Sequence, residues 1–240
     1  MGLKQKLVNF RNRLLGGGGL SHISSEIHFI KALLLKQNEK NLGTLFDIVY
    51  ETNMWGNGSG SGSNEILCKD YVAFLQDFFK KHNIKSVVDA GCGDWQFSKN
   101  IDFSGIEYQG FDVASFVIKA NSAKYQKPNV TFTQYNGDFT TLPSADLLLC
   151  KDVLQHLPNA KIQEFISILP RFKYALITND MGDKNNDDIL PTYGRTLDLR
   201  AEPFNTSLEI VFKIQETAEW MKANNVTKIT MLWVNPNIKP

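Results

Sequence analysis

From residue 85 onward, short apolar runs alternate with segments whose apolar positions recur every three to four residues. Apolar runs bounded by turn residues are typical of buried strands, and the three-to-four spacing is typical of helices. The runs predict strands at residues 86–90, 108–112, 130–135, 146–150, 174–178, 208–214 and 228–234. The periodic segments predict helices at residues 114–125, 158–169 and 215–224. This alternation predicts an α/β fold, a doubly wound, Rossmann-like and mainly parallel sheet of about seven strands.

The first 84 residues follow a different pattern. Helical spacing over residues 24–41 and an apolar helical pattern over 71–79 predict two helices. Between them lies a Gly/Ser loop, residues 55–63. Its composition fits a flexible linker, and its place between two apolar segments fits equally well a mobile lid over a site. We therefore divide the chain into an N-terminal helical extension with this loop (1–84) and a core domain (85–240).

Charge and composition narrow the possible partners. The 240-residue chain carries 26 Lys and Arg against 25 Asp and Glu, so no overall basic field attracts nucleic acid. Its three cysteines are widely spaced, which argues against a disulfide framework and indicates a reducing compartment. No apolar run approaches the ~18 residues of a membrane span. We expect a cytoplasmic protein that acts on a small molecule, and a homodimer is compatible with the sequence.

Glycines and acids follow the first two predicted strands, where an open parallel sheet binds its ligands. Gly91 and Gly93 let a ligand approach the backbone closely. Asp112, at the end of the second strand, is placed to accept hydrogen bonds from ribose hydroxyls. Asp89 suits an amino-bearing ligand better than a phosphate, and Gln96 stands where a dinucleotide motif requires a further glycine. These residues favour a nucleoside cofactor other than NAD.

An acid and an aromatic residue follow the third predicted strand. Asp138 could bind an exocyclic amine, and Phe139 could stack on a purine. Each strand-end acid also has a simpler interpretation, in which it caps the next helix while the glycines form a tight turn without a ligand. Three acids at successive strand ends, with glycines after the first, favour the cofactor site.

These motifs resemble those of the class I S-adenosylmethionine-dependent methyltransferases. The resemblance rests on residues 87–93, 112, 137–138 and 149–158, and it identifies the 85–240 region as a methyltransferase core that binds S-adenosyl-L-methionine. It implies that the methionine portion of the cofactor is surrounded by Asp89, Gly91 and Gly93. It also implies that Asp112 binds the ribose hydroxyls and that Asp138 binds the adenine amine. The chain departs from the family at Trp95, where a third glycine is common.

More narrowly, the chain resembles small bacterial methyltransferases that modify sugars and surface polysaccharides. We therefore expect an O-methyltransferase that acts on a hydroxyl of a small acceptor, with a sugar or nucleotide sugar of surface-polysaccharide biosynthesis as the favoured substrate. An N-methyltransferase or other small-molecule methyltransferase is the alternative enzyme. A non-catalytic nucleoside-binding subunit is the alternative outside enzymes.

An alcohol acceptor needs a base, and His156 after the fourth strand is the first candidate. Asp152 could orient it if the segment is helical, since four residues make about one turn. The simpler interpretation is that His156 caps the next helix or fills a gap in the core. In a less favoured arrangement, Asp152, Asn179 and Asp180 hold Mg²⁺ against substrate hydroxyls. Solvated loop acids are the preferred interpretation of these three residues.

The polar segment at residues 180–205 is long for a connection in this fold, which predicts a loop that faces the substrate. Its candidate substrate-binding residues are Tyr193, Arg195 and Arg200. The arginines could bind phosphate or carboxylate, or could pair with the aspartates of the same loop.

Overall fold

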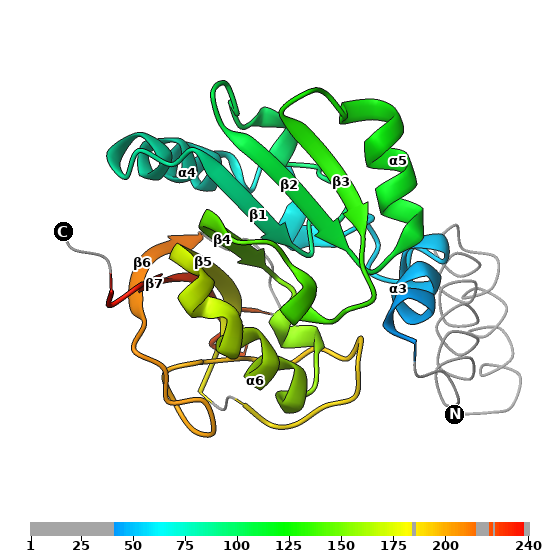
Figure 1. Cartoon of the computed structure of the whole chain (residues 1–240). Helices are drawn as coiled ribbons and strands as arrows, with labels where there is room; N and C mark the ends of the chain where they lie inside the picture. The colour runs from blue at the N-terminus through cyan, green and yellow to red at the C-terminus, as the bar shows by residue number, and fades with distance from the viewer. Residues whose placement is uncertain (1–40, 184–185, 215–220, 223, 238–240) are drawn as a thin grey trace, which may run out of the picture.

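A seven-stranded sheet with helices on both faces forms the body of the molecule (Figure 1). The computed structural model describes residues 41–183, 186–214, 221–222 and 224–237. The strand order is β3-β2-β1-β4-β5-β7-β6. The strands are β1 (Ser86–Ala90), β2 (Glu107–Asp112), β3 (Val130–Gln134), β4 (Ala145–Lys151), β5 (Phe172–Met181), β6 (Glu209–Ile214) and β7 (Thr227–Val234). This architecture confirms the predicted α/β fold.

The first five strands are parallel, and β7 runs antiparallel to both of its neighbours, β5 and β6. The pairing of β5 with β7 continues to Met181, opposite Thr227, so β5 is longer than the predicted strand at 174–178. Asn179 and Asp180 therefore lie inside β5, where the sequence analysis had placed them after it.

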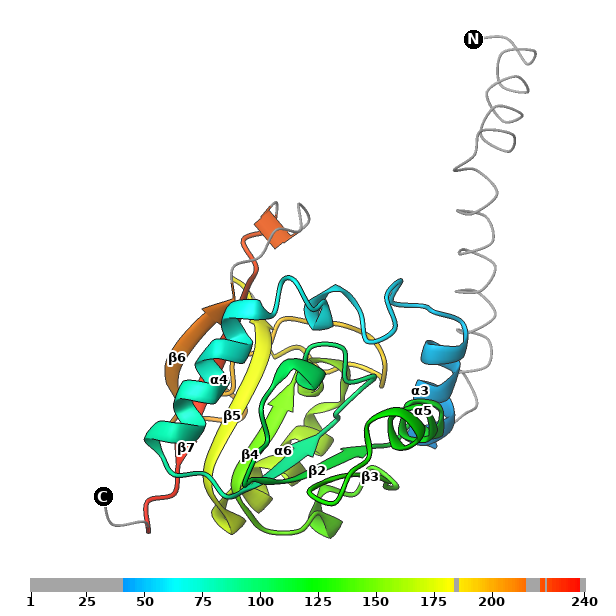
Figure 2. The same ribbon diagram turned by 90° about the horizontal axis from the view of Figure 1, so that it is seen from above.

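Four helices surround the sheet in the described part of the chain: α3 (Leu42–Glu51), α4 (Lys69–Lys81), α5 (Ser115–Tyr125) and α6 (Asn159–Ile168). Buried residues of α4 cluster with Leu176 of β5, whereas buried residues of α6 cluster with Ala175 and Ile177. Successive side chains of a strand point to opposite faces, so α4 and α6 cover opposite faces of the sheet (Figure 2).

The structure bears on two of the predicted helices and on the expected boundary at residue 85. Apart from Asn41, the predicted helix at 24–41 lies outside the described residues, as does most of the predicted helix at 215–224. Helix α4 precedes the expected boundary at residue 85 but shares one apolar cluster with Val87 of β1 and Tyr108 of β2. The expected boundary therefore divides a continuous core. No helix among the described residues is long and apolar enough to cross a membrane.

Helix α3 was not among the predicted elements. Asn41 caps it, accepting a hydrogen bond from the Thr44 backbone N–H at 3.2 Å. Asp47 of α3 in turn accepts hydrogen bonds from the Ser115 hydroxyl at 2.9 Å and the Phe116 N–H at 2.8 Å, at the start of α5. These contacts fix α3 beside the carboxyl ends of the strands.

Candidate active site and cofactor cavity

A cavity opens at the carboxyl ends of β1, β2 and β4, where the sequence analysis had placed the ligand. It holds about 780 Å³ of empty space, counted out to its open mouth. Its wall contains the glycine turn after β1, Asp112 at the end of β2, Phe139 after β3 and residues 151–153 after β4. Side chains of α3 and of the Gly/Ser loop complete the wall.

The turn after β1 depends on its two glycines. Gly91 has φ +93°, and a Cβ there would collide with Val153. Gly93 has φ +55°, and a Cβ there would collide with Ser59 of the Gly/Ser loop. Any other residue at either position would carry a left-handed backbone and also occupy space that the wall already fills.

Trp95, at the position where a third glycine was expected, has a left-handed backbone with φ +60°. A left-handed residue other than glycine costs on the order of 1 kcal/mol. The indole offsets this cost by packing: its exposed fraction is 5%, and its Nε1–H donates to the Tyr108 hydroxyl at 2.9 Å. The turn therefore accommodates a large residue at this position.

Asp89 is held at the base of the cavity by Tyr108, whose hydroxyl donates to its Oδ2 at 2.6 Å. Burial, together with the nearby Asp112, raises the pKa of Asp89 to about 7, although the Tyr108 hydrogen bond and Lys151 act to lower it. A buried carboxylate with a raised pKa is stabilised by a cationic partner. Asp89 therefore fits a ligand that presents an ammonium group.

Asp112 accepts hydrogen bonds from two backbone donors, Gly93 N–H at 3.0 Å to Oδ2 and Ala114 N–H at 2.9 Å to Oδ1. Burial raises the pKa of Asp112 to about 6, although these donors favour its charged form. A carboxylate has about four acceptor positions, so both oxygens can still accept from a hydroxyl pair. Asp112 lines the cavity and fits a ribose.

The two residues predicted after β3 have different surroundings. Phe139 is buried, lines the cavity and packs edge-on against Phe165 at 5.2 Å between ring centroids. Asp138 caps the short helix Phe139–Thr141 through its Oδ1, which accepts from the Thr140 N–H at 2.9 Å and hydroxyl at 2.6 Å. These hydrogen bonds lower the pKa of Asp138. The contacts favour the helix-capping interpretation of Asp138.

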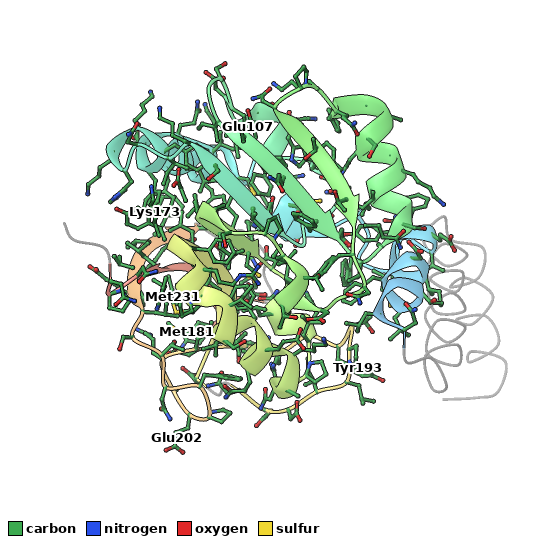
Figure 3. The ribbon with its side chains drawn as sticks, viewed as in Figure 1. Glu107, Lys173, Met181, Tyr193, Glu202 and Met231 are labelled. Atoms are coloured by element: carbon green, nitrogen blue, oxygen red, sulfur yellow. The ribbon has the colours of Figure 1, made fainter. Side chains whose placement is uncertain are left out.

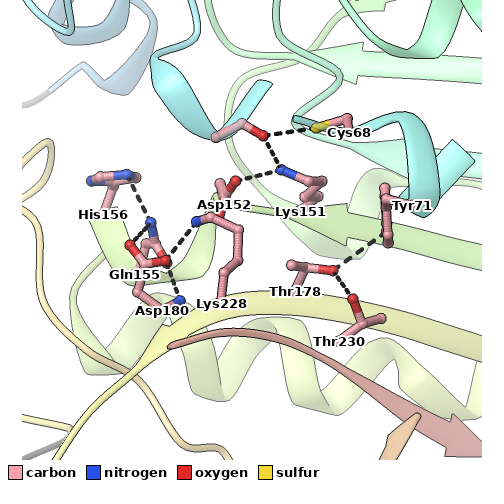
Figure 4. A network of polar contacts seen from close by, with 11 residues as sticks. Cys68, Tyr71, Lys151, Asp152, Gln155, His156, Thr178, Asp180, Lys228 and Thr230 are labelled. Carbon is pink, nitrogen blue, oxygen red and sulfur yellow. Dashed lines mark hydrogen bonds and ion pairs between the residues drawn. The ribbon is translucent and has the colours of Figure 1, made fainter. Parts of the chain in front are cut away.

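Asp152 lies in a buried charge cluster at the inner wall of the cavity (Figure 4). Its Oδ1 is 2.5 Å from Lys228 Nζ, and its Oδ2 is 2.6 Å from Lys151 Nζ. Burial raises the pKa of Asp152, but the two ammonium groups outweigh it and hold that pKa below its usual range. Burial would likewise lower the pKa of Lys228, whereas Asp152 and Asp180 raise it overall. Asp152 and Lys228 are therefore both charged at neutral pH.

Lys228 occupies the position that the Mg²⁺ arrangement would give to the metal. Its Nζ lies 2.5 Å from Asp180 Oδ1 as well as from Asp152, so one ammonium bridges both carboxylates. Asn179 is adjacent to Asp180 on β5, so its side chain points to the opposite face of the sheet. The three proposed ligands do not converge, and the described residues contain no cluster of three His, Cys, Asp or Glu side chains suited to a metal.

His156 ends the short 3-10 helix Leu154–His156 and is oriented by a backbone carbonyl. Its Nδ1 is 3.0 Å from the Tyr193 carbonyl oxygen, and its ring lies 5.0 Å from the Trp55 ring between centroids. Nδ1 therefore carries the proton, which leaves the lone pair on Nε2, and Gln155 Nε2 approaches that nitrogen at 3.5 Å. Burial lowers the pKa of His156, and the Tyr193 hydrogen bond offsets this only in part. The imidazole is therefore neutral at pH 7.

The structure does not bring Asp152 and His156 together as expected. Asp152 has a left-handed backbone, with φ +59°, and precedes the 3-10 helix, so the two side chains are not one helical turn apart. The Asp152 carboxylate binds Lys151 and Lys228. The Tyr193 carbonyl, and not Asp152, orients the His156 imidazole.

The candidate substrate loop uses its arginines internally. Arg195 donates to Asn159 Oδ1 at 2.7 Å and to the Leu157 carbonyl at 2.8 Å, and Arg200 binds Asp198 at 2.8 Å. Tyr193 has an exposed fraction of 47% and lies on the outer side of the loop in Figure 3. The contacts favour pairing with an aspartate for Arg200, whereas the Arg195 guanidinium joins the loop to residues 157 and 159.

Sequence reasoning did not single out Lys151 or Lys228, nor the α3 residue Tyr50, which also lines the cavity. One local signal was available for Lys228, a lysine within an otherwise apolar strand. Such a lysine needs buried carboxylates, and its partners lie 76 and 48 positions away in the sequence. The position of Tyr50 follows from α3, an element that the sequence pattern did not predict.

Comparisons with known proteins agree with this geometry. The O-methyltransferase domain family matches residues 51–193, more than half of the chain. The chain is similar to magnesium protoporphyrin IX methyltransferase from Synechocystis PCC 6803, solved with bound SAH, at a TM-score of 0.54 and 16% identity over 80% of this chain and 98% of that one. It is also similar to the methyltransferase domain of bacterial CtHen1, at a TM-score of 0.51 and 16% identity over 70% and 99% of the two chains.

At these identities the solved structures establish a shared fold. No curated protein matches the chain in sequence. The chain belongs to the O-methyltransferase domain family and is an enzyme, a methyltransferase that uses S-adenosylmethionine.

Proposed function

We propose that this enzyme transfers the methyl group of S-adenosylmethionine to a hydroxyl of a small neutral acceptor, a sugar in the first instance. One observation carries the proposal: a single cavity joins the buried carboxylates Asp89 and Asp112 to the polar wall formed by residues 151–152. Asp89 and Asp112 fit a cofactor that bears an ammonium group and two ribose hydroxyls. Residues 151–152 supply polar groups for an acceptor.

The residues of the turn fit the cofactor. Asp112 would accept hydrogen bonds from the ribose hydroxyls, and Asp89 would pair with the ammonium of the methionine portion. Gly91 and Gly93 let the turn pack closely against Val153 and Ser59 in the cavity wall, and Phe139 gives the cofactor end of the cavity an apolar wall. When bound, the cofactor supplies an electrophilic sulfonium methyl group. We do not assign the adenine amine to Asp138, because its carboxylate caps a helix.

His156 is our candidate for the general base. Its neutral imidazole has Nδ1–H fixed on the Tyr193 carbonyl, so Nε2 can take the proton of an acceptor hydroxyl as the new O–C bond forms. Its ring packs against Trp55, which lines the cavity, whereas His156 itself does not line it, so Nε2 must move toward the acceptor side to act as the base. Asp152 belongs to the acceptor wall in this account and does not orient the base.

The acceptor class follows from what the cavity offers. A sugar presents several hydroxyls and an apolar ring face, which suit the Lys151–Asp152 pair and the indole of Trp55. Arg195 and Arg200 are engaged within their loop, so a neutral sugar fits better than the diphosphate of a nucleotide sugar. An origin of that sugar in surface-polysaccharide biosynthesis is in keeping with the narrower sequence resemblance.

An acceptor panel tests this proposal directly. Purified protein is incubated with methyl-labelled S-adenosylmethionine and neutral glycosides, nucleotide sugars, phenols or primary amines, with and without EDTA. We expect label on a neutral glycoside as an alkali-stable ether, at equal rates with and without EDTA. Label on amines alone would replace the proposal with N-methylation, and cofactor binding without transfer would favour the non-catalytic alternative.

Replacing His156 with Gln should lower kcat by about 10²–10⁴-fold, because the acceptor hydroxyl loses its base. The affinity for S-adenosylmethionine should change little, since the imidazole lies outside the cofactor end of the cavity. Kinetics on the accepted sugar and calorimetry with the cofactor provide the two measurements. The matched control is His82→Gln, at the end of α4. Equal activity per folded molecule in the two variants would make His156 a structural residue.

A further inference from the structure

The Gly/Ser loop covers the glycine turn. Ser59 and Ser63 line the cavity, and Ser59 lies so close to Gly93 that no Cβ fits between them. Gly93 is also the residue whose N–H binds Asp112. The loop therefore lies over the stretch between the carboxylate proposed for the ribose and the turn proposed for the methionine portion.

Paired hydrogen bonds join the loop to the segment that follows the turn. The Ser59 hydroxyl accepts from the Asp94 N–H at 2.9 Å, and the Ser59 N–H donates to Asp94 Oδ2 at 3.1 Å. Gln96 Nε2 donates to the Asn57 carbonyl at 2.7 Å, while Asn57 Nδ2 donates to Gln96 Oε1 at 3.1 Å. The Ser59 hydroxyl also lies 3.1 Å from the Tyr50 hydroxyl. These bonds are polar and partly exposed, so they can exchange with water when the loop moves.

The far end of the loop is anchored on the buried charge cluster. The Gly62 carbonyl accepts from Lys151 Nζ at 2.6 Å and from the Cys68 thiol at 3.1 Å. Lys151 is fixed in turn by Asp152 and, through it, by Lys228 (Figure 4). Its ammonium therefore presents one donor at a fixed point, and the loop binds there through a backbone carbonyl.

Only glycine permits this anchor. A Cβ at Gly62 would lie 2.5 Å from Asp152 Oδ2 and 3.2 Å from Lys228 Cε. The clash is with the charge cluster itself, whose carboxylate is held from two sides and cannot easily move. The backbone at Gly62 is not left-handed, so an alanine there causes no backbone strain. Its methyl group disturbs only the contact between the loop and the charge cluster.

We propose that the Gly/Ser loop is a mobile lid of the cofactor site. The lid is closed when the Gly62 carbonyl binds Lys151, and it must open for the cofactor to enter and its product to leave. The closed loop brings Ser59 and Ser63 to the bound cofactor. The inference rests on the cofactor placement proposed above. It also favours the mobile lid over the flexible linker as the interpretation of the Gly/Ser loop, because a linker would have no fixed contact with the sheet.

Gly62→Ala provides the test, with Ser61→Ala as the matched control, because Ser61 is exposed and adjacent in the same loop. Dissociation of S-adenosylhomocysteine is followed by stopped-flow displacement, and hydrogen exchange of residues 55–63 is measured without ligand. We expect Gly62→Ala to speed dissociation by about tenfold or more and to raise exchange in the loop, while Ser61→Ala matches the wild type. A circular dichroism melt confirms that both variants are folded.

A second variant keeps the test decisive if Gly62→Ala folds poorly. Ser59→Ala removes the hydroxyl contacts with Asp94 and Tyr50 without a clash, and should change both readouts in the same direction. Wild-type rates of dissociation and hydrogen exchange in both loop variants would contradict the proposed lid without contradicting the proposed cofactor site. A wild-type protein that binds no S-adenosylhomocysteine would overturn the cofactor placement and this inference together.

Discussion

Replacing Lys228 with Met should lower the free energy of unfolding by about 3–5 kcal/mol, the usual result of removing one partner from a buried ion pair. Lys228 Nζ bridges Asp152 and Asp180 at 2.5 Å each, and its side chain has an exposed fraction of 4%. Without it, Asp152 keeps Lys151 as a partner, whereas Asp180 loses the ammonium that it binds. Urea denaturation followed by circular dichroism measures the loss, and Lys213→Met, at an exposed position of β6, is the control.

The pH dependence of this effect has a definite sign. The pKa of Asp152 is lower in the folded protein than in the unfolded chain, so its contribution to stability is present above the unfolded pKa and is lost as the pH falls. The difference between wild type and Lys228→Met should therefore be largest near neutral pH and should shrink below about pH 4. A difference that is constant with pH, or a loss no larger than that of Lys213→Met, would mean that the cluster does not stabilise the fold through its charges.

Replacing Asp112 with Asn should weaken binding of S-adenosylhomocysteine by about 1–3 kcal/mol, because charge-assisted hydrogen bonds to the ribose hydroxyls are lost. The single side-chain oxygen of the variant can accept from only one of the two backbone N–H groups, Gly93 or Ala114, so a circular dichroism melt must first show that the variant is folded. Isothermal calorimetry measures the affinity, with the exposed Asp102→Asn as the control. Unchanged affinity in Asp112→Asn would remove this residue from the ribose site.

The parts of the fold and site that could be predicted from sequence are those encoded by neighbouring residues. The strand pattern and the turn around Gly91 and Gly93 depend on local periodicity and backbone freedom, so the cavity was expected in the right place. The capping role of Asp138 is also local, since its partner Thr140 is two positions away. The family resemblance implied that Asp138 binds the adenine amine, whereas the contacts of its carboxylate favour helix capping.

The parts that could not be predicted depend on distant partners. Lys228 is positioned by one carboxylate after β4 and one in β5, and no local pattern shows that β7 pairs with β5 so that Lys228 reaches both. Helix α3 contains the strand-like run Phe-Asp-Ile-Val-Tyr, and its cap and its contacts with α5 decide in favour of helix. Trp95 shows that a position which favours glycine can hold a large residue when a hydrogen bond and close packing offset the backbone strain.

The cavity at the carboxyl ends of β1, β2 and β4 should bind S-adenosylmethionine. Calorimetric titration of the wild-type protein with S-adenosylmethionine, S-adenosylhomocysteine and NAD tests it most directly. We predict saturable binding of the first two ligands, abolished or weakened in Asp112→Asn, and no binding of NAD. Binding of NAD, or no binding of either S-adenosyl compound by folded protein, would contradict the account.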